Sequence, residues 1–252
     1  MDLGLAGKRV LVTAGSRGLG AATARAFAGE GGRVAVVARD QARLGRLLEE
    51  LGGPEAGHAV LAADLMAPGE PERTVRVLAG KGGPFDIVIH NLGGTLGVKD
   101  ALADPEAWAR VWRCNAGVAL EINNQVIPPM LARGWGRIVH VSSNAADSGR
   151  GAAPYAAAKA YLNTYVKAIG RTFAPAGLAI SAVLPGAFET EDGHWARVRR
   201  DNPAFLEDFL RHHQAIGRLG RPEEIAAFLL FLASPAASFA TGSVLTVDGG
   251  GM

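Results

Sequence analysis

Seven short runs rich in valine and isoleucine recur along the 252-residue chain, and they constrain its fold more than any other feature. They occupy residues 9–14, 33–38, 58–63, 85–91, 137–143, 179–185 and 243–249. Several runs are apolar at successive positions, as in "RVAVVA", which is typical of strands buried on both faces of a parallel sheet. Such strands require helices on both faces of the sheet.

Helical patterns fall between these runs. Residues 40–52 begin with Asp40 as a cap, place leucines 44, 47, 48 and 51 on one face and stop at a glycine. Asp104-Pro105 and Pro222 open two further helices, and Pro128-Pro129 should end or kink a long one. The alternation predicts an α/β fold: a Rossmann-like, doubly wound, seven-stranded parallel sheet flanked by helices. Without repeats or linkers, we expect one domain over residues 1–252.

The composition argues against several classes of partner. A net charge of +2 without a long basic run disfavours nucleic acid. The longest apolar run, residues 225–233, is far shorter than the roughly 20 residues that span a bilayer. The N-terminus lacks the pattern of a signal peptide, and a single cysteine, Cys114, excludes an internal disulfide. We therefore expect a cytoplasmic protein with no membrane or nucleic-acid partner.

A glycine-rich turn follows the first predicted strand. In "TAGSRGLGAATARAFA", Gly15, Gly18 and Gly20 stand between that strand and an alanine-rich helix. Glycines let the backbone turn tightly and approach a bound group, while the helix offers free N–H groups to a pyrophosphate. The position of this turn indicates a dinucleotide-binding loop.

Tyr155 and Lys159 stand four residues apart in an alanine-rich segment, so they should share one face of a helix. A nearby ammonium group stabilises a phenolate and lowers the pKa of tyrosine from its usual value of about 10. The pair could therefore form a proton-transfer site. On this segment alone, two ordinary polar residues on a partly exposed helix are the alternative.

Taken together, these motifs resemble the short-chain dehydrogenase/reductase family. Within that family, their pattern is most similar to that of the 3-oxoacyl-(acyl carrier protein) reductase-like members. The family's T-G-x-x-x-G-x-G loop corresponds to residues 13–20, with Ala14 in place of the first glycine. "HNLGG" stands where the family has N-N-A-G, so His90 and Leu92 depart from the pattern. The matches are Asn91, Gly93, Asp64, Asn115, a Ser-Ser pair, Tyr155, Lys159, Pro185, Gly186 and Thr190.

The resemblance implies a catalytic site of Asn115, Ser143, Tyr155 and Lys159. Tyr155 would be the general acid during reduction, and Lys159 would also bind the nicotinamide ribose. Ser143 would donate a hydrogen bond to the substrate carbonyl oxygen. Ser142 is its rival, because Ser142 has the family's spacing from the tyrosine while Ser143 has the expected place at the strand end. Asn115 would hold a water that leads to Lys159, or would instead satisfy helix backbone groups.

The resemblance also implies NADP(H) as cofactor, with no metal. The expected cofactor residues are Gly15, Ser16, Arg17, Gly18, Leu19, Gly20, Arg39, Asp64, Leu65, Asn91, Gly93, Tyr155, Lys159, Pro185, Gly186 and Thr190. NAD enzymes of this fold carry an acidic residue at the end of the second strand, where this chain has Ala38 followed by Arg39. Arg39, helped by Arg17, could pair with a 2′-phosphate. Asp40 as a ribose ligand is the alternative.

The implied activity is an NADPH-dependent oxidoreductase that reduces a ketone, of 3-oxoacyl type or another apolar carbonyl, to a secondary alcohol. The substrate would be a small-molecule carbonyl, possibly an acyl thioester. Ala176 stands where carrier-protein reductases often have a basic residue, which weakens the case for carrier docking. The alternatives are a non-catalytic NADP-binding regulatory protein and an alcohol dehydrogenase acting on a sugar or steroid.

Two features of the whole molecule follow from the same resemblance. Residues 187–217 should form a mobile lid over the substrate, with Trp195, Phe205, Leu206, Phe209 and Leu210 as its apolar face. The protein should be a homotetramer, because the helices carrying Trp108, Trp112, Val118 and Leu120 look too apolar to face water.

Overall fold

The computed structural model describes residues 2–251, which form a seven-stranded parallel sheet in the order β3-β2-β1-β4-β5-β6-β7. The strands are β1 (Arg9–Thr13), β2 (Arg33–Ala38), β3 (Ala59–Ala62), β4 (Ile87–His90), β5 (Gly136–Val141), β6 (Leu178–Pro185) and β7 (Val244–Val247). The strand order reverses between β1 and β4, which makes the sheet doubly wound. The predicted fold class is confirmed.

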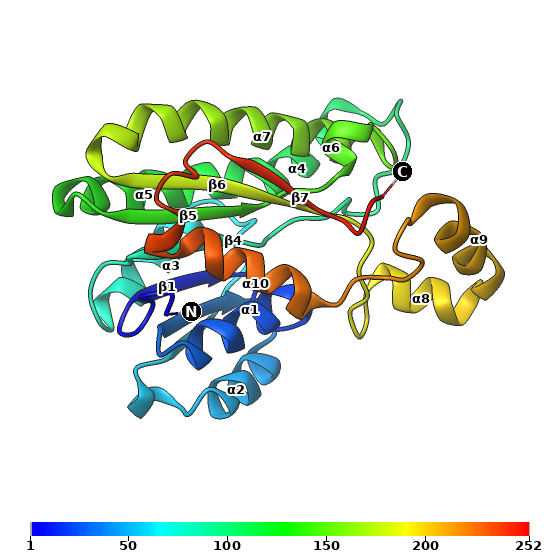
Figure 1. Ribbon diagram of the computed structural model, residues 1–252. Helices are drawn as coiled ribbons and strands as arrows, with labels where there is room; N and C mark the ends of the chain where they lie inside the picture. Colours follow the sequence, from blue (N-terminus) through cyan, green and yellow to red (C-terminus); the bar gives the residue numbers. More distant parts are fainter. Residues whose placement is uncertain (1, 252) are drawn as a thin grey trace.

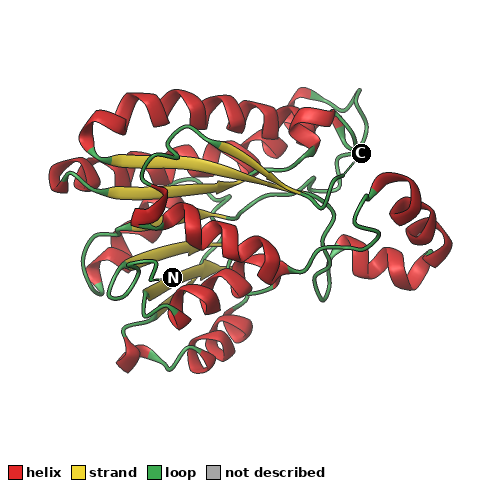
Figure 2. Ribbon diagram, in the orientation of Figure 1, coloured by secondary structure: helices red, strands yellow, loops and turns green. Residues whose placement is uncertain are grey.

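Helices cover both faces of the sheet (Figure 2). One face carries α1 (Gly18–Gly29), α2 (Gln41–Glu50) and α10 (Pro222–Ala233). The other carries α3 (Glu70–Gly80), α4 (Pro105–Trp112), α5 (Val118–Arg133) and α7 (Ala153–Phe173). A π-helical turn at Arg113–Gly117 joins α4 to α5, and α6 (Ala145–Ser148) precedes α7. Single 3₁₀ turns lie at Pro54–Ala56, Ala174–Ala176 and Pro235–Ala237.

A hydrophobic core lies on each face of the sheet, and each central strand contributes side chains to both cores. This explains why the central strands are apolar at successive positions. In β1, Val10 and Val12 pack toward α1 and α10, while Leu11 packs toward α3 and α5. Successive residues of a strand point to opposite faces, so a strand covered on both sides is apolar at successive positions.

The expected helix starts are confirmed. The side chain of Asp40 accepts a hydrogen bond from the backbone N–H of Arg43 at 2.9 Å, and Asp104 caps α4 in the same way through Ala107 at 2.6 Å. These caps satisfy N–H groups that have no partner within the helix.

Of the two outcomes expected at Pro128-Pro129, an end or a kink of the long helix, the end is excluded, because α5 continues to Arg133. The carbonyls that lose their helical partners belong to residues 124 and 125, which are exposed, while Ile127 and Met130 hold the helix against the core. Val118, expected to be buried by contact with another subunit, is 2% exposed and packs into the core of its own chain, because it faces the sheet.

The segment expected to form a lid contains α8 (His194–Asp201) and α9 (Pro203–His213). Figure 1 shows both helices standing out from the body, beyond the C-terminal ends of the strands. Leu206 is the buried residue of these two helices, and Phe205 is 50% exposed. Among residues 2–251, none of the helices combines the length and the apolar character needed to cross a membrane.

Candidate active site

The residues singled out in the sequence gather where the parallel strands end. The glycine loop follows β1, Asn91 and Gly93 follow β4, the serine pair follows β5, and Pro185 ends β6. The strand order places β1, β4, β5 and β6 side by side. Ligands of open α/β sheets bind outside the carboxyl ends of the strands, at the point where the strand order reverses.

Lys159 joins α7 to the end of β5. It is 2% exposed, and its ammonium group donates a hydrogen bond to the backbone oxygen of Val141 at 2.7 Å. The same ammonium lies 5.7 Å from the centre of the Tyr155 ring. The predicted pair is therefore together on one face of α7, directed at the strand that carries the serines.

The two serines after β5 face different surroundings. Ser142 is 3% exposed, and its hydroxyl donates to the backbone oxygen of Lys159 at 3.4 Å. The Ser143 hydroxyl accepts from the N–H of Ala145 at 3.2 Å and faces the Tyr155 phenol, whose pKa it lowers. Adjacent residues in extended backbone point to opposite sides, so only one of them can face the phenol. The structure places Ser143 there and Ser142 in the packing between β5 and α7.

The electrostatics of the pair differ from the sequence-based expectation. We expected Lys159, helped by the positive nicotinamide ring of the oxidised cofactor, to lower the pKa of Tyr155. In the protein alone burial raises that pKa, and Ser143 only partly opposes the effect. Burial also lowers the pKa of Lys159 to about 8. Both groups lose hydration, which disfavours their charged forms. The protein by itself thus keeps Tyr155 as a phenol, the form that can donate a proton.

Asn115 lies in the π-helical turn between α4 and α5 and is 2% exposed. Its side-chain NH₂ donates to the backbone oxygens of Val111 and Gly94, both at 2.8 Å, and its oxygen accepts from the N–H of Gly94 at 2.9 Å. The side chain therefore satisfies a helix carbonyl and holds the loop after β4. A Cβ added at Gly93 would lie 2.7 Å from the Asn115 oxygen and 3.0 Å from the Lys159 ammonium, so glycine is required there.

The glycine loop packs directly against Asn91. The Asn91 side chain donates to the backbone oxygens of Thr13 at 3.3 Å and Ala14 at 3.2 Å. A Cβ at Gly20 would lie 2.6 Å from the Asn91 side-chain nitrogen, which accounts for glycine at that position. The sequence motifs after β1 and β4 therefore build one continuous loop surface.

The other predicted cofactor residues surround this surface to different degrees. Thr190 lies over the loop, with its methyl carbon 3.0 Å from where a Cβ on Gly18 would be. Asp64 is exposed, and its carboxylate accepts from the N–H of Met66 at 3.0 Å. Leu19 and Leu65 are 5% and 4% exposed, with side chains in the core, so only their backbones can contact a ligand.

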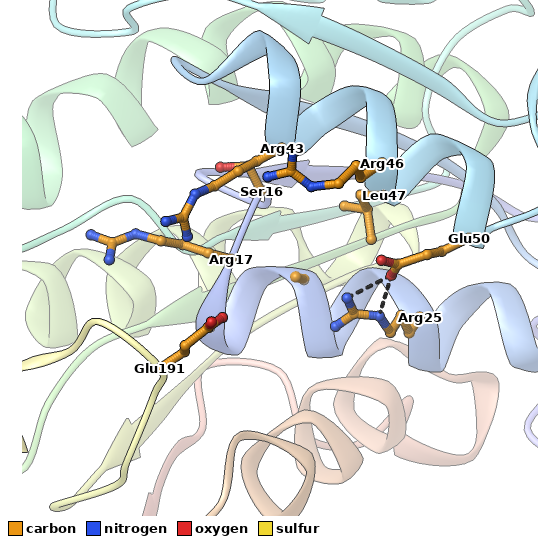
Figure 3. Close-up of a pocket in the computed structure, with 10 residues that line it drawn as sticks. Ser16, Arg17, Arg25, Arg43, Arg46, Leu47, Glu50 and Glu191 are labelled. Carbon is orange, nitrogen blue, oxygen red and sulfur yellow. Dashed lines mark hydrogen bonds and ion pairs between the residues drawn. The ribbon is translucent and has the colours of Figure 1, made fainter. Parts of the chain in front are cut away.

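A cavity of about 290 Å³ lies beside the glycine loop, between α1 and α2. Figure 3 shows Ser16 and Arg17 of the loop together with Arg43 and Arg46 of α2, while Arg25 and Glu50 pair at the other end. We call Arg17, Arg43 and Arg46 the arginine cluster. The sequence analysis missed Arg43 and Arg46, although their spacing of three on α2 was a signal that they share a helix face.

Arg39 lies apart from this cavity. It is exposed at the end of β2 and is not among the residues that line the cavity. Its charge acts on the buried Cys114 thiol, as do those of Lys159 and Asp64. Burial raises the pKa of Cys114, so the thiol is protonated and suits a packing role better than a nucleophilic one.

Comparisons with known proteins agree with this geometry. The family model described as enoyl-(acyl carrier protein) reductase matches residues 13–251. The 3-oxoacyl-[acyl-carrier-protein] reductase of Vibrio cholerae is 32% identical over 249 residues, covering 98% of this chain and 98% of that protein. The 2,3-dihydroxy-2,3-dihydro-p-cumate dehydrogenase of Pseudomonas putida is 33% identical over 253 residues, covering 98% and 95%.

Solved structures show the same relationship. The crystal structure of L-sorbose reductase from Gluconobacter frateurii, complexed with NADPH and L-sorbose, matches with a TM-score of 0.92 and 30% identity. The match covers 100% of this chain and 99% of that one. Since the family model and these relatives span nearly the whole chain, and since the motifs converge on one edge of the sheet, the chain belongs to the short-chain dehydrogenase/reductase family.

Proposed function

We propose that this protein is an NADP(H)-dependent oxidoreductase that reduces a ketone to a secondary alcohol, with Tyr155 as the proton donor. The observation that carries the proposal is the grouping of Tyr155 with Ser143 and Lys159 beside the glycine loop. A non-catalytic nucleotide-binding protein would have no need of a buried lysine beside a partly buried phenol.

Each of the three side chains has a chemical role in this proposal. A carbonyl oxygen gains negative charge as it is reduced, and hydrogen-bond donors placed at that oxygen lower the barrier. Ser143, at the end of β5, and Tyr155, on α7, bring two hydroxyl donors to the same edge of the sheet. Tyr155 then transfers its proton to the oxygen, and Lys159 stabilises the phenolate that this leaves. Asn115 keeps the loop beside Lys159 in place through its bonds to Gly94.

The residues beside the sheet fit NADP(H). The glycine loop and the first turn of α1 offer backbone N–H groups to a pyrophosphate, and the arginine cluster offers guanidinium groups to a 2′-phosphate. Lys159 would hold the nicotinamide ribose, as the resemblance to the family implies. When bound, the cofactor supplies the hydride to the carbonyl carbon. The L-sorbose reductase with NADPH supports this choice.

We infer the substrate class from the side chains of the predicted lid, residues 187–217. Trp195 and Phe209 pack together with ring centres 4.3 Å apart, and Phe205 is 50% exposed, which favours a mainly apolar carbonyl compound. The relatives are named for an oxoacyl carrier protein, a p-cumate dihydrodiol and a sugar, so membership of the family does not select among these. The proposed substrates include acyl thioesters.

The test is NADPH oxidation with a panel of 3-oxoacyl thioesters, ketoses and apolar ketones, on wild type and Tyr155→Phe. The variant should bind NADPH normally and lose turnover by about 100-fold or more, because general acid catalysis contributes that much. Tyr161→Phe is the matched control, since Tyr161 lies on the same helix but is 43% exposed. If Tyr155→Phe kept wild-type turnover, or if the panel gave no oxidation, the proposal would be wrong.

A further inference from the structure

The lid is tied to the cofactor side of the molecule by one ion pair. A guanidinium nitrogen of Arg43, in the first turn of α2, lies 2.8 Å from a carboxylate oxygen of Asp192. Asp192 follows Thr190, which lies over Gly18 of the glycine loop. The first residues of the lid therefore rest on the loop and on α2, which are distant from them in sequence.

Asp192 is the lid carboxylate that contacts the arginine cluster. The hydrogen bond from Arg43 lowers the pKa of Asp192, and the charges of Arg17 and Arg197 act in the same direction. Its neighbour Glu191 lines the cavity and lies near Arg17 (Figure 3). Arg43 also lies 3.3 Å from a carboxylate oxygen of Asp40, but that carboxylate caps α2 through the Arg43 N–H. Asp192 is thus a separate anion brought to the cluster by the lid.

We propose that Asp192 occupies Arg43 in the free protein as an internal anion, and that the 2′-phosphate of NADP(H) replaces it there. This inference rests on the cofactor of the proposed function. Arg43 and Arg17 then select NADP(H) over NAD(H). Asp192, by competing for Arg43, determines how large that preference is. A phosphate is a stronger partner for guanidinium groups than one carboxylate, because it offers more acceptor oxygens and more charge. Displacement of Asp192 breaks the tie between the lid and α2.

The location of the pair supports this exchange. Both side chains are partly exposed, 32% for Arg43 and 57% for Asp192, so a ligand can reach them. The cavity beside them is bordered by Ser16 and Arg17, the residues of the dinucleotide-binding loop nearest to α2. An exposed ion pair is weak, so a ligand anion can displace it at small cost.

The test compares two fragments of the cofactor, 2′,5′-ADP and 5′-AMP, alongside NADPH and NADH, by calorimetry or fluorescence. Asp192→Asn removes the competing charge and keeps the shape. It should bind 2′,5′-ADP and NADPH about threefold to fivefold more tightly, the factor expected for loss of an exposed ion pair. Its affinity for 5′-AMP and NADH should not change. Asp201→Asn is the matched control, because Asp201 is a lid carboxylate paired with its neighbour Arg200.

A second variant separates competition from an indirect effect. Arg43→Gln should weaken 2′,5′-ADP binding about tenfold or more, as expected for a charged hydrogen bond. In the Arg43→Gln background, Asp192→Asn should have little further effect, because the two residues act through one contact. Unchanged or weaker 2′,5′-ADP binding by Asp192→Asn would overturn the inference while leaving the cofactor assignment intact. Failure of wild type to bind either NADPH or 2′,5′-ADP would overturn both.

Discussion

Ala14 is a residue whose backbone does not suit its side chain. Its φ of 50° lies in the left-handed region, which costs a residue with a Cβ about 1–2 kcal/mol. Its carbonyl accepts a hydrogen bond from the Asn91 side chain, so the loop after β4 helps to hold this conformation. Glycine avoids the cost, which is the physical reason for the glycine that the family's motif has at this position.

Ala14→Gly should therefore stabilise the protein. The substitution removes about 1–2 kcal/mol of backbone strain from the folded state. The greater conformational entropy of glycine in the unfolded chain costs about 0.5–1 kcal/mol, so the free energy of unfolding should rise by about 0.5–1 kcal/mol. Urea unfolding would measure it. Ala42→Gly, at an exposed position of α2, is the control and should lower stability by about 1 kcal/mol. A loss of stability in Ala14→Gly as large as that of the control would contradict this account.

At the scale of elements, β4 and β5 are joined by a buried pair of imidazoles that the sequence analysis missed. His90 and His140 are register partners, and their rings stack with centres 4.5 Å apart. His90 hydrogen-bonds the Asn123 side chain at 2.8 Å, and Asn123 donates to the Tyr165 hydroxyl at 3.0 Å. Within residues 2–251, neither ring nitrogen of His140 has a hydrogen-bond partner. The departure at His90 from the family's N-N-A-G motif was the available signal.

This pair should make the fold sensitive to acid. Burial lowers the pKa of His90 to about 4 and that of His140 well below its usual value, and the charge of Lys159 adds to the effect on His140. Above about pH 6.5 both histidines are neutral whether the chain is folded or unfolded, so they contribute no pH dependence. Below it the unfolded chain binds the extra protons, so the free energy of unfolding should fall by about 4 kcal/mol by pH 5.

Unfolding by urea at pH 7.5 and pH 5, on wild type and His140→Leu, checks this expectation. The variant should lose about 2 kcal/mol less than wild type between the two conditions, because one titrating group is gone. His213→Leu, at an exposed position of α9, is the control and should behave as wild type does. Equal acid sensitivity in all three proteins would show that the stacked pair is not responsible.

At the scale of the whole molecule, two pairs of exposed aromatic side chains lie on separate surfaces. On α4 and α7, Trp112 and Tyr161 are 38% and 43% exposed and meet edge to face at 5.7 Å. Phe228 and Phe231 on α10 are 41% and 40% exposed. Figure 1 shows α10 and α7 on opposite sides of the sheet. Two distinct self-complementary surfaces on one chain are what a tetramer with three twofold axes requires.

The proposed homotetramer can be tested by light scattering. The wild-type mass should be four times the 26.1 kDa of one chain. A charge in either surface, Tyr161→Glu or Phe231→Glu, should halve that mass, because the other surface still pairs the chains. Phe205→Ser, at an exposed lid position outside both surfaces, should leave the tetramer intact. A wild-type mass equal to one chain would refute the proposal.

Much of the fold was readable from the sequence, because local rules set it. Strands buried on both faces are apolar at most successive positions, so their runs marked all seven strands to within about two residues. Asp40 and Asp104 marked two helix starts, since an unpaired N–H group near a helix start needs a local acceptor. The order of the motifs brought Tyr155, Lys159 and the serine pair together, because parallel strands end at one edge of the sheet.

The tertiary structure decided what depends on contacts between distant segments. Ser143 rather than Ser142 faces Tyr155, because Ser142 is packed between β5 and α7, where its hydroxyl bonds the backbone oxygen of Lys159. In the protein alone the pKa of Tyr155 is raised, because burial disfavours the phenolate. A spacing of four residues does not reveal burial, so the sequence could not predict this direction. The contact between Arg43 and Asp192 joins residues 149 apart in the sequence. Such a pair has no local signature, because only the folded chain brings the lid back over α2.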